Sequence, residues 1–356
     1  MKKGKVIVGL SGGVDSTVAA YLLKEQGYDV VGVTMEMWPG ENSQKAIEDA
    51  RRVANAIGIP FEVLDFKKEF RECVVNDFMA QYQKGLTPNP CIVCNRMVKG
   101  QALLDKAHEM GAEHIATGHY ARIEKHPKTG RYAVKNSATA VKDQTYALYR
   151  LTQEQLQAML LPIGEYAKDE VRKIAEKIDG FVAKKGDSQD ICFIPDGDYA
   201  AFIEREGGYK GTPGDFVDME GNVVGKHKGL IHYTVGQRKG LGIALGKPVF
   251  VYGVDAEKNQ VRLCDNAALF QTKLYAGNLA YMAYEKFEDG MRFQAKIRYA
   301  HKPAWCTVKM VGDDVLEVTF DEPQRAITPG QSLVLYDGEY VAGGGFVLPD
   351  GIAKKM

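Results

Sequence analysis

The chain has 356 residues, of which 45% are hydrophobic and 26% charged, so its composition is that of an ordinary globular protein. Its 46 basic and 46 acidic side chains exclude a protein that is basic throughout, although a local basic face can still bind nucleic acid. No apolar run approaches the roughly 18 residues of a membrane span, so we expect no membrane partner. Six cysteines in so long a chain do not form a disulfide framework, which favours the reducing cytoplasm and cysteines used for metal binding or thiol chemistry.

The first half of the chain alternates between strand and helix patterns. The opening residues lead straight into a glycine loop, which predicts a first buried strand and not a secretory signal. The expected strands are Lys5–Leu10, Tyr28–Trp38, Pro60–Phe66 and His114–Thr117, and the first expected helices are Ser16–Gln26 and Ser43–Ile57. This alternation predicts an α/β fold in which helices cover both faces of a parallel sheet.

After about Phe193 the pattern changes. Ile194–Gly246 is rich in glycine and shows few helical periods. Short β-type runs then recur between turn signals at Val249–Val254, Gln294–Tyr299, Trp305–Val311, Val315–Phe320 and Ser332–Tyr336. Their spacing predicts a small β-barrel or sandwich. Length alone suggests two to three domains.

The strongest local signal is the segment Ser11-Gly12-Gly13-Val14-Asp15-Ser16, which joins the first strand to the first helix. Glycines let the backbone approach an anion, and a helix N-terminus presents free N–H groups to it. Ser11 and Ser16 add hydroxyl groups, and Asp15 is a candidate Mg²⁺ ligand on pyrophosphate oxygens. No lysine follows the glycines, so this is not the usual P-loop. The hexapeptide resembles the signature of the PP-loop ATP pyrophosphatases, which cleave ATP between the α and β phosphates.

Cysteines provide the second and third signals. Cys91 and Cys94 form a C-x-x-C after two prolines that flank Asn89, so we expect Cys94 near a helix N-terminus, where the helix dipole favours a thiolate. A zinc half-site or two incidental buried thiols are the alternatives, but the sequence has no second ligand pair for zinc. Cys192 comes shortly after the polar segment Asp187–Asp190. A single cysteine before two apolar residues is ordinarily a core residue. The polar residues before it suggest a loop instead, in which the thiol could react.

Taken together, the ordered motifs resemble one family over nearly the whole chain, the tRNA-specific 2-thiouridylases. They are the PP-loop hexapeptide, Thr87–Arg96, Ala116–Tyr120, Lys142–Gln144, Cys192–Ile194 and Gly229–Gly242. The resemblance implies an ATP-dependent transfer of sulfur to C2 of the wobble uridine in a tRNA anticodon. It also implies a PP-loop domain at residues 1–195, a small central β-rich domain at 196–268 and a C-terminal β-barrel at 269–356.

The resemblance also implies a role for each matched residue. Cys94 is the expected nucleophile and Cys192 the persulfide carrier, and the two alternately form a disulfide. ATP is expected against Gly9, Leu10, Ser11, Gly12, Gly13, Val14, Asp15, Ser16, Met35 and Gly118. The target base and the tRNA are expected against Asn89, Pro90, Cys91, His119, Lys142, Asp143, Gln144, Arg298, Tyr299 and Gln331. The implied partners are tRNA, a persulfide donor protein or cysteine desulfurase, and a disulfide reductant.

Three positions depart from the family pattern. Many members carry Asp where this chain has Cys91, which excludes a carboxylate acid or base at that position. The family's Lys-Phe pair is Lys99-Gly100 here, and the stretch Glu36–Asn42 is short. The extra thiol raises a second hypothesis, an iron–sulfur cluster on Cys91, Cys94 and Cys192 with one open iron. We favour the persulfide mechanism, because the motif order matches a persulfide family.

Rival interpretations remain at this stage. Another PP-loop ligase or amidating synthetase would use ATP without the cysteines, and a non-enzymatic RNA-binding protein would need neither. Lys226–Lys228 and Arg238-Lys239 flank Tyr233, a mixture of cations and an aromatic ring that suits RNA. Without the family resemblance, a solvated charged loop would be the better interpretation of that stretch.

Overall fold

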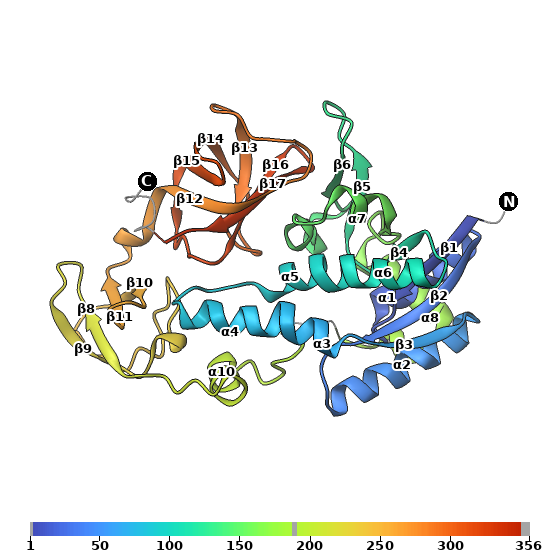
Figure 1. Ribbon diagram of the computed structural model, residues 1–356, viewed down its shortest axis with the longest axis horizontal. Coiled ribbons are helices and arrows are strands. Elements are labelled where there is room, and N and C mark those ends of the chain that lie inside the picture. Colours follow the sequence, from blue (N-terminus) through green and yellow to red (C-terminus); the bar gives the residue numbers. More distant parts are fainter. Residues whose placement is uncertain (1–2, 187–190, 350–356) are drawn as a thin grey trace.

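The structure is a computed structural model that describes residues 3–186 and 191–349. The polar segment expected to lead into Cys192, Asp187–Asp190, lies outside the described residues. Figure 1 shows an α/β part at the N-terminal end, a small sheet at the opposite end and a barrel above the helices that join them. This order confirms the expected fold class. The domain boundaries at residues 195 and 268 stay a prediction.

The N-terminal sheet is parallel, with five strands in the order β3-β2-β1-β4-β7. Its strands are β1 Lys3–Gly9, β2 Tyr28–Glu36, β3 Phe61–Asp65, β4 His114–Ala116 and β7 Met159–Leu160. The helices of this part are α1 Val14–Glu25, α2 Glu41–Ile57, α3 Lys67–Phe70, α4 Asn76–Gln83, α5 Pro90–Arg96, α6 Leu103–Glu109, α7 Gln153–Ala158, α8 Lys168–Ile178 and α9 Gly180–Ala183.

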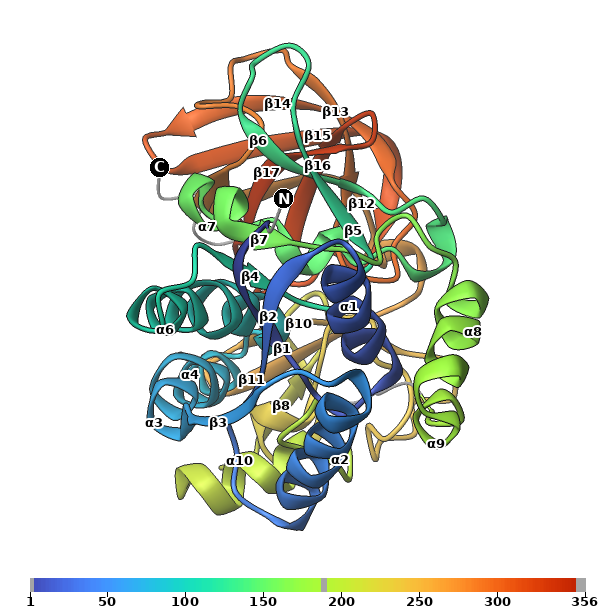
Figure 2. The same ribbon diagram turned by 90° about the vertical axis from the view of Figure 1, so that its right-hand side faces the viewer.

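Helices cover both faces of this sheet, as predicted. Successive side chains of a strand point to opposite faces, and β1 follows this rule. Val6 and Val8 pack into the core that α1, α2 and α8 build, whereas Ile7 packs into the core of α4, α5 and α6. Figure 2 shows β1 and β2 between these two groups of helices. The carboxyl ends of β1, β2 and β4 therefore meet at one edge, where parallel α/β sheets bind ligands.

Two single π-helical turns interrupt the helices beside that edge, Arg71–Val75 between α3 and α4 and Met97–Ala102 between α5 and α6. The second turn contains Gly100, at which an added Cβ would lie 2.8 Å from the Asn95 carbonyl oxygen. Gln155 donates its side-chain amide to the Arg96 carbonyl at 3.0 Å. This close packing explains why glycine stands at position 100. Insertions of this kind often occur at functional sites.

The central part is a four-stranded sheet in the order β10-β11-β8-β9. Its strands are β8 Gly214–Val217, β9 Val223–His227, β10 Phe250–Asp255 and β11 Gln260–Cys264. It is preceded by α10 Tyr199–Gly207, a helix that the glycine-rich composition had led us not to expect. Asp198 caps this helix by accepting the Ala201 N–H, and Gly208 ends it in the left-handed conformation at φ +61°.

The C-terminal part is a closed antiparallel barrel in the order β12-β15-β14-β13-β16-β17, with β17 pairing back to β12. Of the two folds that the sequence predicts for this part, the closed sheet confirms the barrel and not the sandwich. Its strands are β12 Phe270–Tyr281, β13 Arg292–Lys296, β14 Ala304–Gly312, β15 Val315–Arg325, β16 Ser332–Asp337 and β17 Tyr340–Val347. A hairpin of the N-terminal part, β5 Ala121–Lys125 with β6 Tyr132–Asn136, joins the barrel where Lys135 pairs with Tyr340.

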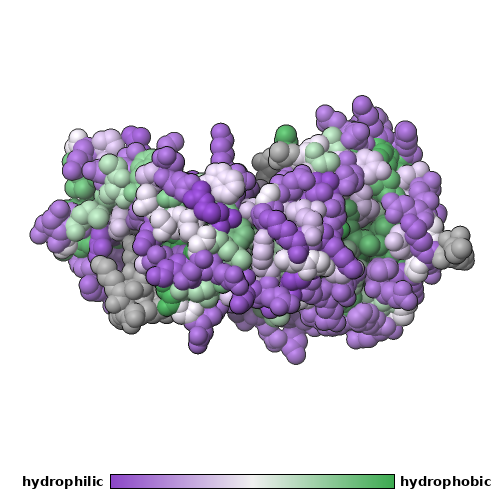
Figure 3. Space-filling model, turned by 90° about the horizontal axis from the view of Figure 1, so that it is seen from above, coloured by the Kyte–Doolittle hydropathy of each residue, from purple (hydrophilic) through white to green (hydrophobic). Residues whose placement is uncertain are grey.

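The molecular surface is mostly polar on the face shown in Figure 3, where hydrophobic atoms form separate areas among hydrophilic ones. Among the described residues, no helix is both long enough and apolar enough to cross a membrane.

Candidate active site

The phosphate loop lies where β1 runs into α1. Gly12 has φ +68°, and an added Cβ would lie 2.7 Å from the Cβ of Asp49 in α2, so only glycine fits. Ser16 Oγ accepts the Ser11 N–H, and the two hydroxyl oxygens are 3.1 Å apart. Within the part of the chain that the structure describes, no side chain caps the first turn of α1. Its free N–H groups and the positive end of the helix dipole therefore form an anion site.

Asp15 projects from this first turn and is held by two partners. Tyr120 donates its hydroxyl to Asp15 Oδ1 at 2.7 Å, and the Lys168 ammonium donates to both carboxylate oxygens. The carboxylate keeps about a third of its accessible surface. Lys168 begins α8, so α8 sets the direction of the carboxylate although it follows 153 residues later.

The segment after β4 packs directly on the phosphate loop. An added Cβ at Gly118 would lie 2.6–2.9 Å from backbone atoms of Asp15 and Ser16, so this position excludes every side chain. His119 follows, with its Nδ1 2.8 Å from the Thr117 hydroxyl. Desolvation, with help from the Lys99 ammonium, lowers the pKa of His119 to about 3, so its ring is neutral at physiological pH.

Two methionines connect the end of β2 to this edge. Met35 lies beside Gly9, because an added Cβ at Gly9 would be 3.2 Å from its terminal methyl. Met37 follows β2, and its sulfur lies 4.0 Å from the Cys94 sulfur. The expected nucleophile therefore lies at the same edge of the sheet as the phosphate loop.

Cys94 differs from the expectation for its helix position and its charge. Asn89 caps α5 by accepting the Cys91 N–H, and Pro90 is the first helical residue. Cys91 therefore occupies the first turn, and Cys94 lies buried in the second. Burial raises the pKa of Cys94 to about 12, although the Lys99 ammonium opposes the rise. The thiolate predicted at Cys94 is therefore wrong for the substrate-free chain, because desolvation outweighs the helix dipole.

The charges of Lys99, Cys91 and Cys192 all act on Cys94. Cys91 and Cys192 are both exposed, and a charge on either of them would raise the pKa of Cys94 further. Desolvation raises the pKa of Cys192 as well, and Lys99 again opposes it. Lys99 thus acts electrostatically on Cys94, Cys192 and His119 together. Lys99 stands out in the sequence only as the first residue of the Lys99-Gly100 pair, and no local pattern distinguishes it from other lysines.

Several residues expected to contact tRNA lie where the N-terminal part meets the barrel. Tyr299 donates its hydroxyl to the Asp143 carbonyl at 3.2 Å. Gln331 donates to the Thr87 carbonyl at 2.7 Å, two residues before Asn89. Gln144 accepts the Tyr120 N–H at 2.8 Å, a contact within the N-terminal part. Lys142 is the last residue of a short 3₁₀ turn, Ala140–Lys142, in the same segment.

A hollow of about 260 Å³ opens beside this junction. All three parts of the chain line it, Thr87 from the first, Thr234 from the second and Arg298, Arg325 and Gln331 from the barrel. Arg298 donates to the Arg325 carbonyl at 3.0 Å. Desolvation and the nearby Arg325 lower the pKa of Arg298, but a guanidinium remains charged at any physiological pH. Two guanidinium groups at one hollow suit a phosphate.

Tyr233 does not have the position expected for a base contact. It is 4% exposed and packs edge-to-face on Phe216 in the core of the central sheet. His227 is buried beside it, and Lys226 is paired with Asp215. The aromatic ring of this basic stretch is therefore a core residue, and stacking on RNA would require it to leave that core.

The hypothesis of an iron–sulfur cluster gains no support from the geometry. Within residues 3–186 and 191–349, no three His, Cys, Asp or Glu side chains converge into a metal-holding group. A single Mg²⁺ carried by nucleotide is a different case, since one carboxylate and the phosphates suffice for it.

A phosphate loop at the carboxyl edge of a parallel sheet defines a nucleotide-binding enzyme of the PP-loop type. Family models agree with the three parts of the chain. A "tRNA methyl transferase HUP domain" matches residues 4–196, a "tRNA methyl transferase PRC-barrel domain" matches 200–265 and an "Aminomethyltransferase beta-barrel domain" matches 271–347. The first of these spans more than half of the chain, and an ATP-binding role follows from it.

The chain belongs to the family of the tRNA-specific 2-thiouridylases. It is 56% identical to the tRNA-specific 2-thiouridylase MnmA of Lachnoclostridium phytofermentans over 355 residues, which cover 97% of this chain and 99% of that relative. It is 52% identical to the MnmA of Clostridioides difficile over 352 residues, which cover 96% and 98%. A solved U34-tRNA thiolase from Methanococcus maripaludis shares 19% identity over 58% of this chain and 67% of its own, with a TM-score of 0.35.

Proposed function

We propose that the chain is a tRNA-uridine 2-sulfurtransferase that activates the wobble uridine with ATP and then replaces its O2 with sulfur. The observation that carries this proposal is the position of Cys94 beside Met37, at the sheet edge that also holds the phosphate loop. A base bound there would have the α-phosphate of ATP and a thiol within reach at one site.

The first step is adenylation. The uridine O2 attacks the α-phosphorus, the bond to the β-phosphate oxygen breaks and pyrophosphate leaves. The N–H groups of the loop and of the first turn of α1 would hold the leaving phosphates. Asp15 would hold Mg²⁺ on them, with Tyr120 and Lys168 fixing the direction of its carboxylate. The neutral His119 ring would contact the base, either as a donor or as an acceptor.

The second step transfers sulfur. A donor protein first leaves a persulfide on Cys192, whose exposed position lets a partner reach it. The terminal sulfur attacks C2, and the Cys94 thiolate then attacks the inner sulfur of Cys192. The persulfide bond breaks, its electron pair stays on the new thiocarbonyl group, AMP leaves, and a Cys94–Cys192 disulfide forms. A two-electron thiol reductant must reopen this disulfide before the next cycle.

The raised pKa of Cys94 fits this order of events. A thiol that is protonated before substrate arrives cannot destroy the Cys192 persulfide prematurely, because the thiolate is the attacking form. The Lys99 ammonium is placed to stabilise the thiolate once a proton has left. We propose the anticodon loop as the part of the tRNA that enters, with its phosphates at Arg298 and Arg325, because loop bases can be splayed out at low cost.

Pyrophosphate release with and without tRNA tests this function. Release that requires tRNA, Mg²⁺ and ATP supports it. Release without tRNA would favour a ligase acting on a small molecule. No release under any condition would favour a binding protein. A Cys94→Ser, Cys192→Ser double variant that keeps making its product would also exclude the sulfur chemistry.

A further inference from the structure

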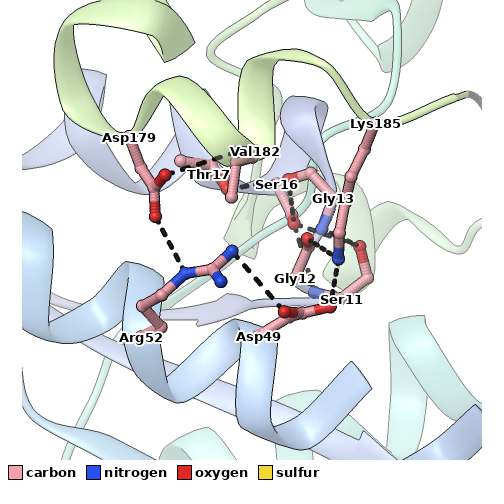
Figure 4. A network of polar contacts seen from close by, with 10 residues as sticks. All are labelled: Ser11, Gly12, Gly13, Ser16, Thr17, Asp49, Arg52, Asp179, Val182 and Lys185. Carbon is pink, nitrogen blue, oxygen red and sulfur yellow. Dashed lines mark hydrogen bonds and ion pairs between the residues drawn. The ribbon is translucent and has the colours of Figure 1, made fainter. Parts of the chain in front are cut away.

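A second lysine, far along the chain, reaches the phosphate loop. Lys185 follows α9, and its ammonium donates to the Gly12 carbonyl at 2.9 Å. The same ammonium forms an ion pair with Asp49, which is buried in α2. Figure 4 shows the Lys185 side chain extending down to the loop from the segment after α9. The loop itself contains no cation, and Lys185 brings one to it from 173 residues away.

The charges around Lys185 form an alternating row. Asp49 also pairs with Arg52 at 3.5 Å, and Arg52 donates to Asp179 at 2.9 Å. Asp179 in turn accepts the Phe181 N–H at the start of α9. Asp49 thus divides its charge between two cations. Phosphate oxygens that enter the loop would compete with this shared carboxylate for the Lys185 ammonium.

Gly12 makes this arrangement possible. An added Cβ at Gly12 would lie 2.7 Å from the Asp49 Cβ and 3.0 Å from two backbone atoms of α2, the Ala46 carbonyl oxygen and the Ala50 nitrogen. The absence of a side chain lets α2 approach the loop so closely that Asp49 can hold Lys185 beside it. Lys185 keeps about a quarter of its side-chain surface accessible, so an incoming anion can reach the ammonium.

We propose that Lys185 binds the β and γ phosphates of ATP, and that Asp49 positions its ammonium beside the loop. This inference rests on the proposed function. The loop N–H groups cannot by themselves balance a triphosphate, most of whose charge lies on the β and γ groups, and ammonium groups usually supply the balance. Lys168 is engaged with Asp15 in the turn of α1, whereas Lys185 contacts the loop at Gly12. Met37 and Lys99 act at the cysteine side of the site, whereas Lys185 lies at the phosphate loop, where the leaving pyrophosphate would bind.

Calorimetric titration of the full chain with ATP and with AMP, without tRNA, tests the inference. Lys185→Met should weaken ATP binding about tenfold or more, the loss expected for a charged hydrogen bond, and leave AMP binding within about twofold. Lys185→Arg should keep ATP binding within about threefold. Lys184→Met is the matched control, since it removes the same charge from the exposed neighbouring residue, and it should change neither affinity.

The titration distinguishes a lysine that binds the phosphates from one that only shapes the loop. Equal loss of ATP and AMP binding in Lys185→Met would mean that the lysine only shapes the loop, and this would overturn the inference. Unchanged ATP binding would overturn it as well. Thermal unfolding without nucleotide shows whether the variant is folded, and Lys185→Arg tests the role of the charge if Lys185→Met is not. A wild-type chain that binds no ATP would refute the proposed function itself, and the wild-type titration alone reveals that failure.

Discussion

Lys168 donates hydrogen bonds to both carboxylate oxygens of Asp15, at 2.8 and 2.9 Å, although the two residues lie 153 positions apart. Tyr120 donates a third hydrogen bond to the same carboxylate. This carboxylate is therefore fixed in direction before any nucleotide arrives. A preorganised charge of this kind is what electrostatic catalysis requires.

Replacing Asp15 by Ala should abolish tRNA-dependent pyrophosphate release and leave tRNA binding largely intact. The carboxylate is the proposed Mg²⁺ ligand at the leaving pyrophosphate, and the residues proposed to contact tRNA lie elsewhere. A pyrophosphate assay and a filter-binding assay measure the two quantities. Asp169→Ala, at the exposed residue after Lys168, is the control and should retain activity. Normal pyrophosphate release from Asp15→Ala would refute the assignment.

Replacing Gly118 by Ala should weaken ATP binding and destabilise the fold by about 1–3 kcal/mol, the usual range for overpacking. The new methyl would lie within 2.6–2.9 Å of Asp15 and Ser16 backbone atoms that cannot move without distorting α1. Urea unfolding and nucleotide titration measure both effects. Gly180→Ala serves as the control, because no described atom outside its chain neighbours and its own helix backbone lies within 4 Å of a Cβ added there. Equal behaviour of the two variants would contradict the close approach.

The alkylation rate of Cys94 should rise about tenfold per pH unit between pH 7 and pH 10, without a plateau. Burial raises the pKa of Cys94 to about 12, so at pH 8 only about one molecule in ten thousand carries the thiolate, and each added pH unit multiplies that fraction by ten. Iodoacetamide labelling followed by mass mapping measures the rate. The exposed Cys91 should react first, and a denaturant should remove the difference. A plateau of the Cys94 rate near pH 8 would contradict the buried thiol.

Under turnover with a persulfide donor, mass mapping should find a Cys94–Cys192 disulfide. The proposed mechanism requires it, and the α-carbons must then approach within about 7 Å in at least one state. Cys91→Asp should preserve activity, because it restores the commoner family residue. Activity and iron content that fall together in Cys91→Asp would instead favour a cluster. A disulfide found only between Cys91 and Cys94 would also count against the mechanism.

The sequence was most informative where the structure is local. The strand, the glycines and the helix start that form the phosphate loop lie within sixteen residues, so one segment contains the whole signal. The start of α5 is also marked by local sequence signals. Asn89 as N-cap and Pro90 as first helical residue are standard helix-start signals, and they put Cys94 in the second turn. Asp198 and Gly208 give similar signals for α10.

The contacts between distant segments could not be predicted in this way. Lys168 and Lys185 reach the loop from more than 150 residues away, and no spacing rule connects them to it. Burial of Cys94 and Tyr233 depends on helices and strands that pack from elsewhere in the chain, so a local pattern of cations and aromatic rings misassigned Tyr233. The pKa of Cys94 follows from that packing and not from its place in a motif.

Nucleoside analysis of tRNA after incubation with ATP, Mg²⁺ and a persulfide donor tests the central claim most directly. The wild-type chain should convert the wobble uridine to 2-thiouridine, with one AMP and one pyrophosphate formed per sulfur transferred. Cys94→Ser and Cys192→Ser should each form no 2-thiouridine. A wild-type reaction that consumes ATP and leaves the tRNA without 2-thiouridine, or a Cys192→Ser variant that thiolates normally, would contradict the account.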